Sequence, residues 1–212
     1  MSAVAAFVAV GYFRAAPALR SVPAGPLAAG ATRVAPPGKA FSLDLPKGWI
    51  DVDPTAPKFI EAHRGSLERF NQSQGTHLEY HPTREALYAY DSATVHDPVP
   101  RTIGLRIKES RGTKVDPQKL ASELGERLAK DVPGIRIFHA EAVRLPVGTV
   151  PRVVASFPLV GKDGETRRTT TITYSLRDQD RLITLTITGM ERDQAEVTAL
   201  GEQVAKSFRS LR

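Results

Sequence analysis

The chain of 212 residues contains no cysteine and a single tryptophan. The absence of cysteine excludes disulfide bonds, thiolate catalysis, zinc sites with cysteine ligands and a lipid anchor on a lipobox cysteine. The sequence also lacks a glycine-rich phosphate loop of either common form, and it lacks a G-x-S-x-G nucleophile elbow. Nucleotide-dependent chemistry and nucleophilic catalysis therefore have little support, and we expect no cofactor.

Acidic residues are absent from the first 40 residues, whereas the rest of the chain is nearly balanced. The net charge is +6, and Arg14, Arg20, Arg33 and Lys39 contribute +4 of it, which leaves +2 for everything after them. A nearly neutral domain lacks the basic surface that phosphate binding requires. We therefore expect no nucleic-acid partner.

Residues 1–40 are rich in alanine, proline and glycine, and their one long apolar run extends from Ala3 to Phe13. This run is shorter than the roughly 20 apolar residues that span a bilayer. It has the length of a signal-peptide core, although no basic segment precedes it. We expect 1–40 to be a signal or anchor remnant and linker that could tether the chain to a membrane, and 41–212 to be the domain. The expected location is extracytoplasmic, secreted or membrane-anchored; the alternative is a cytoplasmic protein with a disordered extension.

Three segments of the domain carry apolar residues at helical spacing, and one of them follows Asp116 and Pro117, which favour a helix start. The predicted buried stripes are Phe59, His63, Leu67 and Phe70; Leu120, Leu124 and Leu128; and Val197, Leu200, Val204, Phe208 and Leu211.

Strands of alternating pattern lie between the last two helices and predict an antiparallel meander. A turn centred on Asp163-Gly164 pairs Phe157 with Thr170, Ala155 with Ile172, and Val153 with Tyr174. A turn centred on Gln179-Asp180 pairs Tyr174 with Leu185, and Leu176 with Ile183.

These registers place hydroxyl side chains on one face of the sheet: Ser156, Thr171, Thr173, Ser175, Thr184, Thr186 and Thr188. We expect this face to be solvated, or to form the floor of a groove for a partner strand or polymer. Both long helices are then expected to cover the opposite face, which carries Val153, Ala155, Ile172, Leu185 and Ile187.

The opening strand "FSLDL" is followed by P-x-G-W. This order of elements is similar to that of PsbP-like proteins. The resemblance rests on Phe41, Leu43, Pro46, Gly48 and Trp49, on the segment "GLRIKES", and on the hairpins and the final helix. That family includes the photosystem II extrinsic protein and the LpqN-type actinobacterial lipoproteins. The resemblance implies an α+β fold, in which an antiparallel meander is packed by amphipathic helices in an α/β/α sandwich. It also implies a binding or assembly module without enzymatic activity, working outside the cytoplasm.

The segment "HLEYH" is the strongest candidate for chemistry. His77, Glu79 and His81 share one face of a strand, and two imidazoles with a carboxylate suit zinc or another divalent cation. Loop histidines without a ligand are the commoner outcome in such a segment, which has Gly75 and Pro82 on either side.

Tyr88 and Tyr90 lie two residues apart on a predicted strand. They either pack on one face of the sheet or form the aromatic rim of a binding cleft.

We conclude from the sequence that the chain is a monomeric, non-catalytic binding or accessory module of the cell envelope, with a protein or envelope component as its partner. The binding-face candidates are Thr171, Thr173, Thr184, Thr186, Thr188, Tyr88 and Tyr90. The alternatives are a divalent-metal-dependent enzyme centred on "HLEYH" and a cytoplasmic partner-binding protein.

Overall fold

The structure is a computed structural model that describes residues 27, 29–35, 41–77, 79, 85–109, 115–160, 165–178 and 181–210. Its helices are α1 (Pro57–Gln74), α2 (Pro117–Asp131) and α3 (Gln194–Ser207), with the 3-10 helices η3 (Ser92–Thr94) and η4 (Glu191–Asp193). Its strands are β1 (Thr32–Val34), β2 (Phe41–Leu45), β3 (Trp49–Val52), β4 (Glu85–Asp91), β5 (Thr102–Glu109), β6 (Arg136–Leu145), β7 (Gly148–Val160), β8 (Thr166–Asp178), β9 (Arg181–Met190) and β10 (Arg209–Ser210). In the described part of the chain, none of the helices combines the length and the apolar character needed to cross a bilayer.

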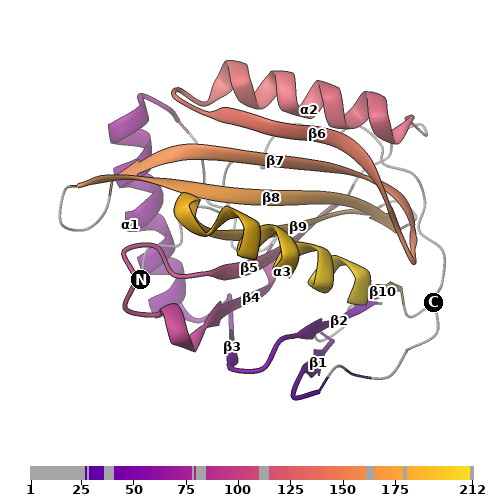
Figure 1. Ribbon diagram of the computed structural model, residues 1–212. Helices are drawn as coiled ribbons and strands as arrows, with labels where there is room; N and C mark the ends of the chain where they lie inside the picture. Colours follow the sequence, from indigo (N-terminus) through magenta and orange to yellow (C-terminus); the bar gives the residue numbers. More distant parts are fainter. Residues whose placement is uncertain are drawn as a thin grey trace.

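Seven strands form one antiparallel sheet in the order β3-β4-β5-β9-β8-β7-β6, and β1-β2-β10 form a smaller one. Helix α3 lies in front of the large sheet in Figure 1, while α1 and α2 lie behind it or along its upper edge. The α+β fold with an antiparallel meander between helical layers is therefore confirmed.

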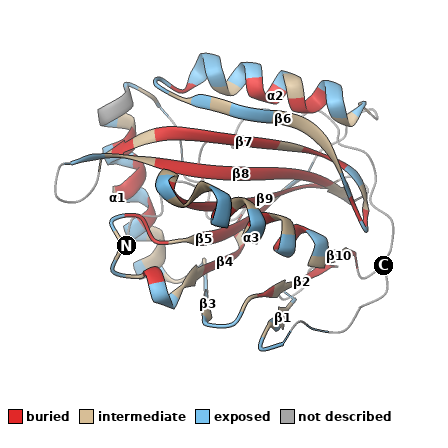
Figure 2. Cartoon of the chain, in the orientation of Figure 1, coloured by how far each residue is buried: buried red, intermediate tan, exposed pale blue. Residues whose placement is uncertain are grey.

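The two faces of the large sheet carry separate parts of the core. Val197 and Val204 of α3 pack with Ile172 and Ile187, together with β2 of the small sheet. On the other face, α2 packs through Leu120 and Leu124 on Val153 and Ala155, and the ring of Phe70 in α1 meets Phe157 edge to face at 5.9 Å. Figure 2 shows the consequence, since β7 and β8 are buried along most of their length.

The predicted register of β8 with β9 is confirmed, because Tyr174 faces Leu185 and Leu176 faces Ile183. The predicted register of β7 with β8 is wrong by one residue. The observed pairs are Phe157 with Thr169, Ala155 with Thr171, and Val153 with Thr173. The last pair is Val160 with Thr166, so an odd number of residues joins the strands. A turn centred on Asp163-Gly164 would require an even number.

The expectation of a solvated face lined by hydroxyl side chains is also wrong. Val153 and Ala155 lie on the same side as Thr171 and Thr173, whereas Ser156 lies on the opposite side. The threonines of that side are buried, with exposures of 5% for Thr171, 8% for Thr173, 6% for Thr184, 4% for Thr186 and 1% for Thr188. The two long helices cover opposite faces, not the same one, because the sheet has a helical layer on each side.

Threonines tolerate this burial because their hydroxyls can bond locally while their methyl groups pack. The hydroxyl oxygens of Thr171 and Thr188, which face each other across β8 and β9, lie 3.3 Å apart. Thr171 and Thr173 also line a small cavity of about 10 Å³ under Leu128 of α2. A cavity of this size holds no more than a single water molecule.

Strand β1 comes from the segment that the sequence analysis placed outside the core. It pairs antiparallel with β2, and Arg33 forms two parallel hydrogen bonds with the Asp44 carboxylate, at 2.8 and 3.1 Å. The backbone N–H of Asp44 in turn donates to the Ser207 hydroxyl at the end of α3. The fold therefore includes residues that precede the expected boundary at residue 41.

Candidate binding site at the start of strand β6

The residues of the predicted metal site are only partly described. His77 and Glu79 lie after the end of α1 and are exposed, whereas His81 lies outside the described residues. Within the described ranges, no group of three or more histidine, aspartate or glutamate side chains is arranged to hold a metal ion. A metal site at His77, Glu79 and His81 stays a prediction.

Tyr88 and Tyr90 share one face of β4 but differ in exposure. Tyr88 is only 5% exposed, and its ring contacts those of Phe59 at 4.7 Å and His63 at 5.2 Å. Burial raises the pKa of the Tyr88 phenol. Tyr88 thus packs between α1 and the sheet, while Tyr90 is half-buried beside Ile50 of the edge strand β3.

A charged pair that the sequence analysis did not identify lies in the same layer. The buried carboxylate of Glu85 in β4 bonds the guanidinium of Arg106, its partner in β5. Burial raises the pKa of Glu85, although the charge of Arg106 and its hydrogen bond oppose that shift. His63 of α1 is 1% exposed, and burial, together with the positive charge of Arg106, lowers its pKa to about 3. The side chains of this cluster are buried, so they affect the stability of the fold and present no surface to a macromolecular ligand.

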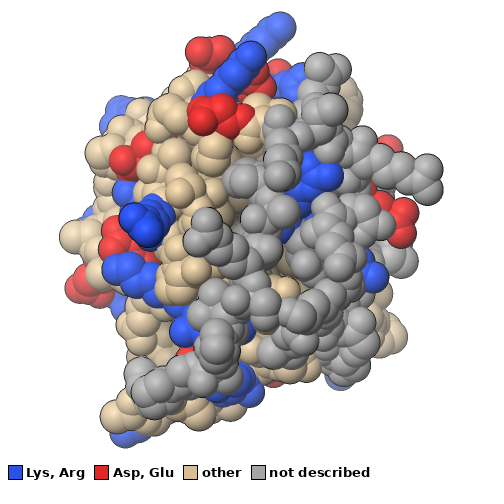
Figure 3. All heavy atoms as spheres, turned by 90° about the vertical axis from the view of Figure 1, so that its right-hand side faces the viewer, with Lys and Arg blue, Asp and Glu red and all other residues tan. Residues whose placement is uncertain are grey.

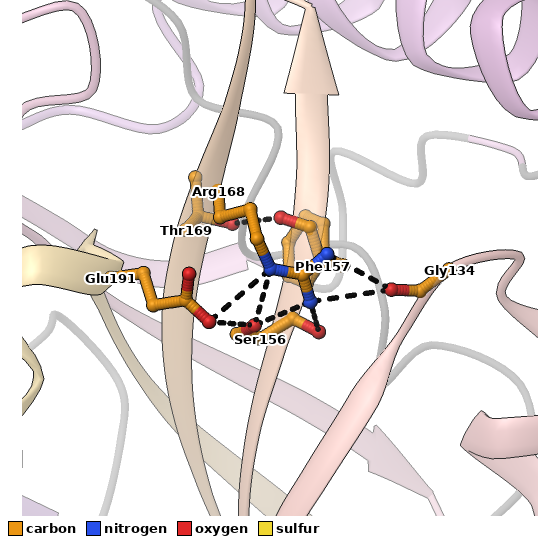
Figure 4. Close-up of polar contacts among 6 residues, drawn as sticks. All are labelled: Gly134, Ser156, Phe157, Arg168, Thr169 and Glu191. Atoms are coloured by element: carbon orange, nitrogen blue, oxygen red, sulfur yellow. Dashed lines mark hydrogen bonds and ion pairs between the residues drawn. The ribbon is translucent and has the colours of Figure 1, made fainter.

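A second polar cluster, the Arg168 clamp, joins four elements near the start of β6 and is formed by Gly134, Ser156, Arg168 and Glu191 (Figure 4). The guanidinium of Arg168 in β8 donates to the Gly134 carbonyl at 3.3 Å, and to the Ser156 hydroxyl at 2.6 Å and carbonyl at 3.1 Å in β7. Its Nε also donates to the Glu191 carboxylate at 3.2 Å. The clamp therefore fixes the connection between α2 and β6 against β7 and β8.

The hydroxyl of Ser156 completes this clamp, since it donates to the Glu191 carboxylate at 2.6 Å. Burial alone would raise the pKa of Glu191, but the hydrogen bonds from Ser156 and Arg168 outweigh it and lower that pKa. Because Ser156 is fully buried and already engaged with both partners, the arrangement suits a structural support better than a nucleophile.

Arg152 of β7 supports the same side of the sheet further along. Its guanidinium donates to Glu141 of β6 at 2.6 Å and to Glu202 of α3 at 3.0 Å. The hydrogen bond from Arg152 lowers the pKa of Glu202, while burial opposes the shift. Arg152 of β7 thus links the neighbouring strand β6 to α3, which packs on one face of the sheet.

Three exposed side chains begin β6 directly after the clamp, and we call Arg136, Phe138 and His139 the β6 rim. Phe138 is 37% exposed and lies at a β-bulge, where the register with β7 shifts between Ile137 and His139. Bulges commonly redirect side chains at the edges of sheets. The β6 rim therefore presents one aromatic and two basic or titratable side chains on a backbone that the Arg168 clamp holds in place.

The face of the molecule in Figure 3 does not form a large field of one charge in its described residues. On the face shown in Figure 3, basic and acidic side chains of the described residues are interspersed. Such a surface suits a protein partner better than the phosphate backbone of a nucleic acid.

No protein-family model matches the chain, and no curated protein matches it. Several solved structures are similar to the chain. LpqN of Mycobacterium tuberculosis, involved in cell envelope biogenesis, is 15% identical with a TM-score of 0.51, over 84% of this chain and 89% of LpqN. A mutant of the protein Mog1 is 13% identical with a TM-score of 0.50, over 85% of this chain and 96% of that chain. Cyanobacterial PsbP (CyanoP) from Synechocystis sp. PCC 6803 is 16% identical with a TM-score of 0.49, over 88% and 95%.

The similarity to LpqN covers most of both chains. At these identities the similarity concerns the fold and not the residues of a site. The chain has the PsbP-like α/β/α sandwich fold.

Proposed function

We propose that the chain is a non-catalytic accessory module of the cell envelope that binds a partner protein through the β6 rim. The observation that carries this proposal is an exposed aromatic side chain, Phe138, on a backbone fixed by the Arg168 clamp. Aromatic and arginine side chains are the residues that most often contribute the binding energy of protein interfaces. A fixed backbone lowers the entropy lost on association.

The charges around the β6 rim indicate the kind of partner. Arg136 and Arg144, near the two ends of β6, are exposed, and neither forms an ion pair within the described part of the chain. Glu141 between them is already engaged by Arg152. A partner segment with an apolar side chain flanked by acidic ones would complement this surface.

Two observations favour a location in the cell envelope. The apolar run in the first 40 residues suits export or a tether, and LpqN, which has this fold, is described as involved in cell envelope biogenesis. We propose an extracytoplasmic, monomeric protein with its N-terminal segment as the tether.

Phe138→Asp is expected to reduce partner binding about tenfold or more, because it removes the aromatic contact and repels acidic side chains of the partner. The full-length protein is immobilised, and the proteins that it retains from a native envelope extract are quantified by mass spectrometry. The matched control is Ile50→Asp, an apolar side chain 44% exposed on the opposite edge strand, β3. A partner that both variants retain equally would contradict the assignment to the β6 rim. A zinc-dependent hydrolytic activity lost on His77→Ala would instead favour the metal-dependent enzyme.

A further inference from the structure

The outer edge of the large sheet is long at β6 and short at β3. Strand β6 has 10 residues and, among the described strands, pairs with β7 alone, whereas β3 at the other edge has 4 residues. A long edge strand exposes unpaired N–H and C=O groups, to which a strand of another molecule can add. The edge of β6 is therefore the place where this fold is most open to self-association.

The pairing with β7 shows which groups of β6 point outward. Ala142 lies opposite Pro151, which has no backbone N–H. The two residues cannot exchange a pair of hydrogen bonds, so the N–H and C=O of Ala142 point away from β7. Because this pattern alternates along an antiparallel strand, the same groups of Ala140 and Arg144 also point outward.

The side chain of Gln118 occupies the middle of this edge. Its Nε2 donates to the Ala140 carbonyl at 3.2 Å, and its Oε1 accepts from the Ala142 N–H at 2.8 Å. The reverse amide orientation would place a donor against the N–H and an acceptor against the carbonyl, so the contacts fix the orientation. One side-chain amide thus occupies two of the backbone groups that an added strand would otherwise bond.

The start of α2 places Gln118 at this position. Pro117 is the first residue of α2, and the Asp116 carboxylate accepts from the N–H of Lys119 at 2.9 Å, which fixes the first turn. Gly125 then lets α2 lie close to β6, since a Cβ at that position would be 3.0 Å from the Cβ of Ala140. Figure 1 shows α2 running along β6.

We propose that Gln118 is an edge cap that keeps β6 from pairing with β6 of a second copy of this chain. The strand is compatible with itself in an antiparallel, twofold arrangement centred on Ala142. In that register Arg144 faces Ala140 of the other copy, and Glu141 faces Val143, so no like charges oppose each other. The proposal concerns self-association and does not depend on the proposed partner.

The test compares the full chain with Gln118→Ala and with Gln118→Asn, whose side chain is one methylene shorter and does not reach both backbone groups. The control is Lys119→Ala in the same turn of α2. At a concentration low enough to keep the variants monomeric, amide hydrogen exchange resolved at Ala142 is expected to be about fivefold faster or more in both Gln118 variants, because the hydrogen bond to Gln118 is lost. Sedimentation velocity is expected to show a concentration-dependent dimer for both Gln118 variants and a monomer for the wild type and Lys119→Ala.

Unchanged exchange at Ala142 would show that Gln118 does not protect the edge. Faster exchange with a monomer at every concentration would overturn its role as a cap against self-association. Dimerisation of the wild type to the same extent as the Gln118 variants would overturn this role as well. Circular dichroism of both variants distinguishes a dimer of folded chains from aggregation of unfolded ones.

Discussion

Replacing Glu85 with glutamine is expected to lower the free energy of unfolding by about 3–5 kcal/mol, the usual cost of breaking a buried ion pair. Glu85 and Arg106 bond each other between β4 and β5, and the side chain of Glu85 is 1% exposed. A neutral amide at position 85 leaves the charge of Arg106 in the interior without that carboxylate. Urea denaturation of the wild type and Glu85→Gln measures the loss.

The double variant Glu85→Leu with Arg106→Met separates the pair from its surroundings. Its loss should be smaller than that of Glu85→Leu or Arg106→Met alone, because no charge then remains buried. Losses that simply add would show that the two side chains do not act as a pair. A loss below about 1 kcal/mol for each single variant would indicate that water reaches the pair.

The stability of the wild type is expected to fall as the pH drops below 6.5, and His63 is expected to cause about 2 kcal/mol of the loss by pH 5. The folded-state pKa of His63 is lowered to about 3, so the unfolded chain takes up a proton first. The contribution is therefore fully present above the unfolded pKa and is lost as the pH falls toward 3. Glu85, whose pKa is raised by burial, works in the opposite direction and reduces the net slope.

His63→Phe isolates this term because it keeps an aromatic ring between Phe59 and Tyr88. Urea curves at pH 7.5, 6.5, 5.5 and 5.0 should show that the free energy of unfolding of His63→Phe falls by about 2 kcal/mol less than that of the wild type between the two ends of this range. The matched control is His139→Phe, at an exposed position, which should keep the slope of the wild type. Parallel curves for His63→Phe and the wild type would contradict the origin of the pH dependence.

Local patterns predicted the helices and one hairpin because a single signal determines each of them. Asp116 and Pro117 mark the start of α2, and the Asp116 side chain makes the expected cap. In the apolar stripe predicted for α1, His63, Leu67 and Phe70 are buried, while Phe59 is half-buried. The register of β7 with β8 could not be fixed in this way, because both faces are covered. Val153 and Val154 are then both buried, so alternation no longer distinguishes the two registers.

The residues of the candidate site were less predictable, since their roles depend on pairing between distant strands. Arg168 lies in a basic loop segment by sequence, and nothing there indicates that Gly134 and Glu191 will approach it. Arg106 alternates with apolar residues and therefore looks like a solvated strand position, yet it lies beneath α1. Phe138 looks like an ordinary core residue by pattern, yet it lies at the bulge in β6 and is 37% exposed.

The most direct test of binding through the β6 rim is photo-crosslinking in native cells, with a photoreactive phenylalanine analogue placed at Phe138 or at Ile50 of the full chain. The proposal predicts one discrete adduct of higher mass from position 138 and none from position 50. An adduct that forms equally from both positions, or only from position 50, would contradict binding at the β6 rim.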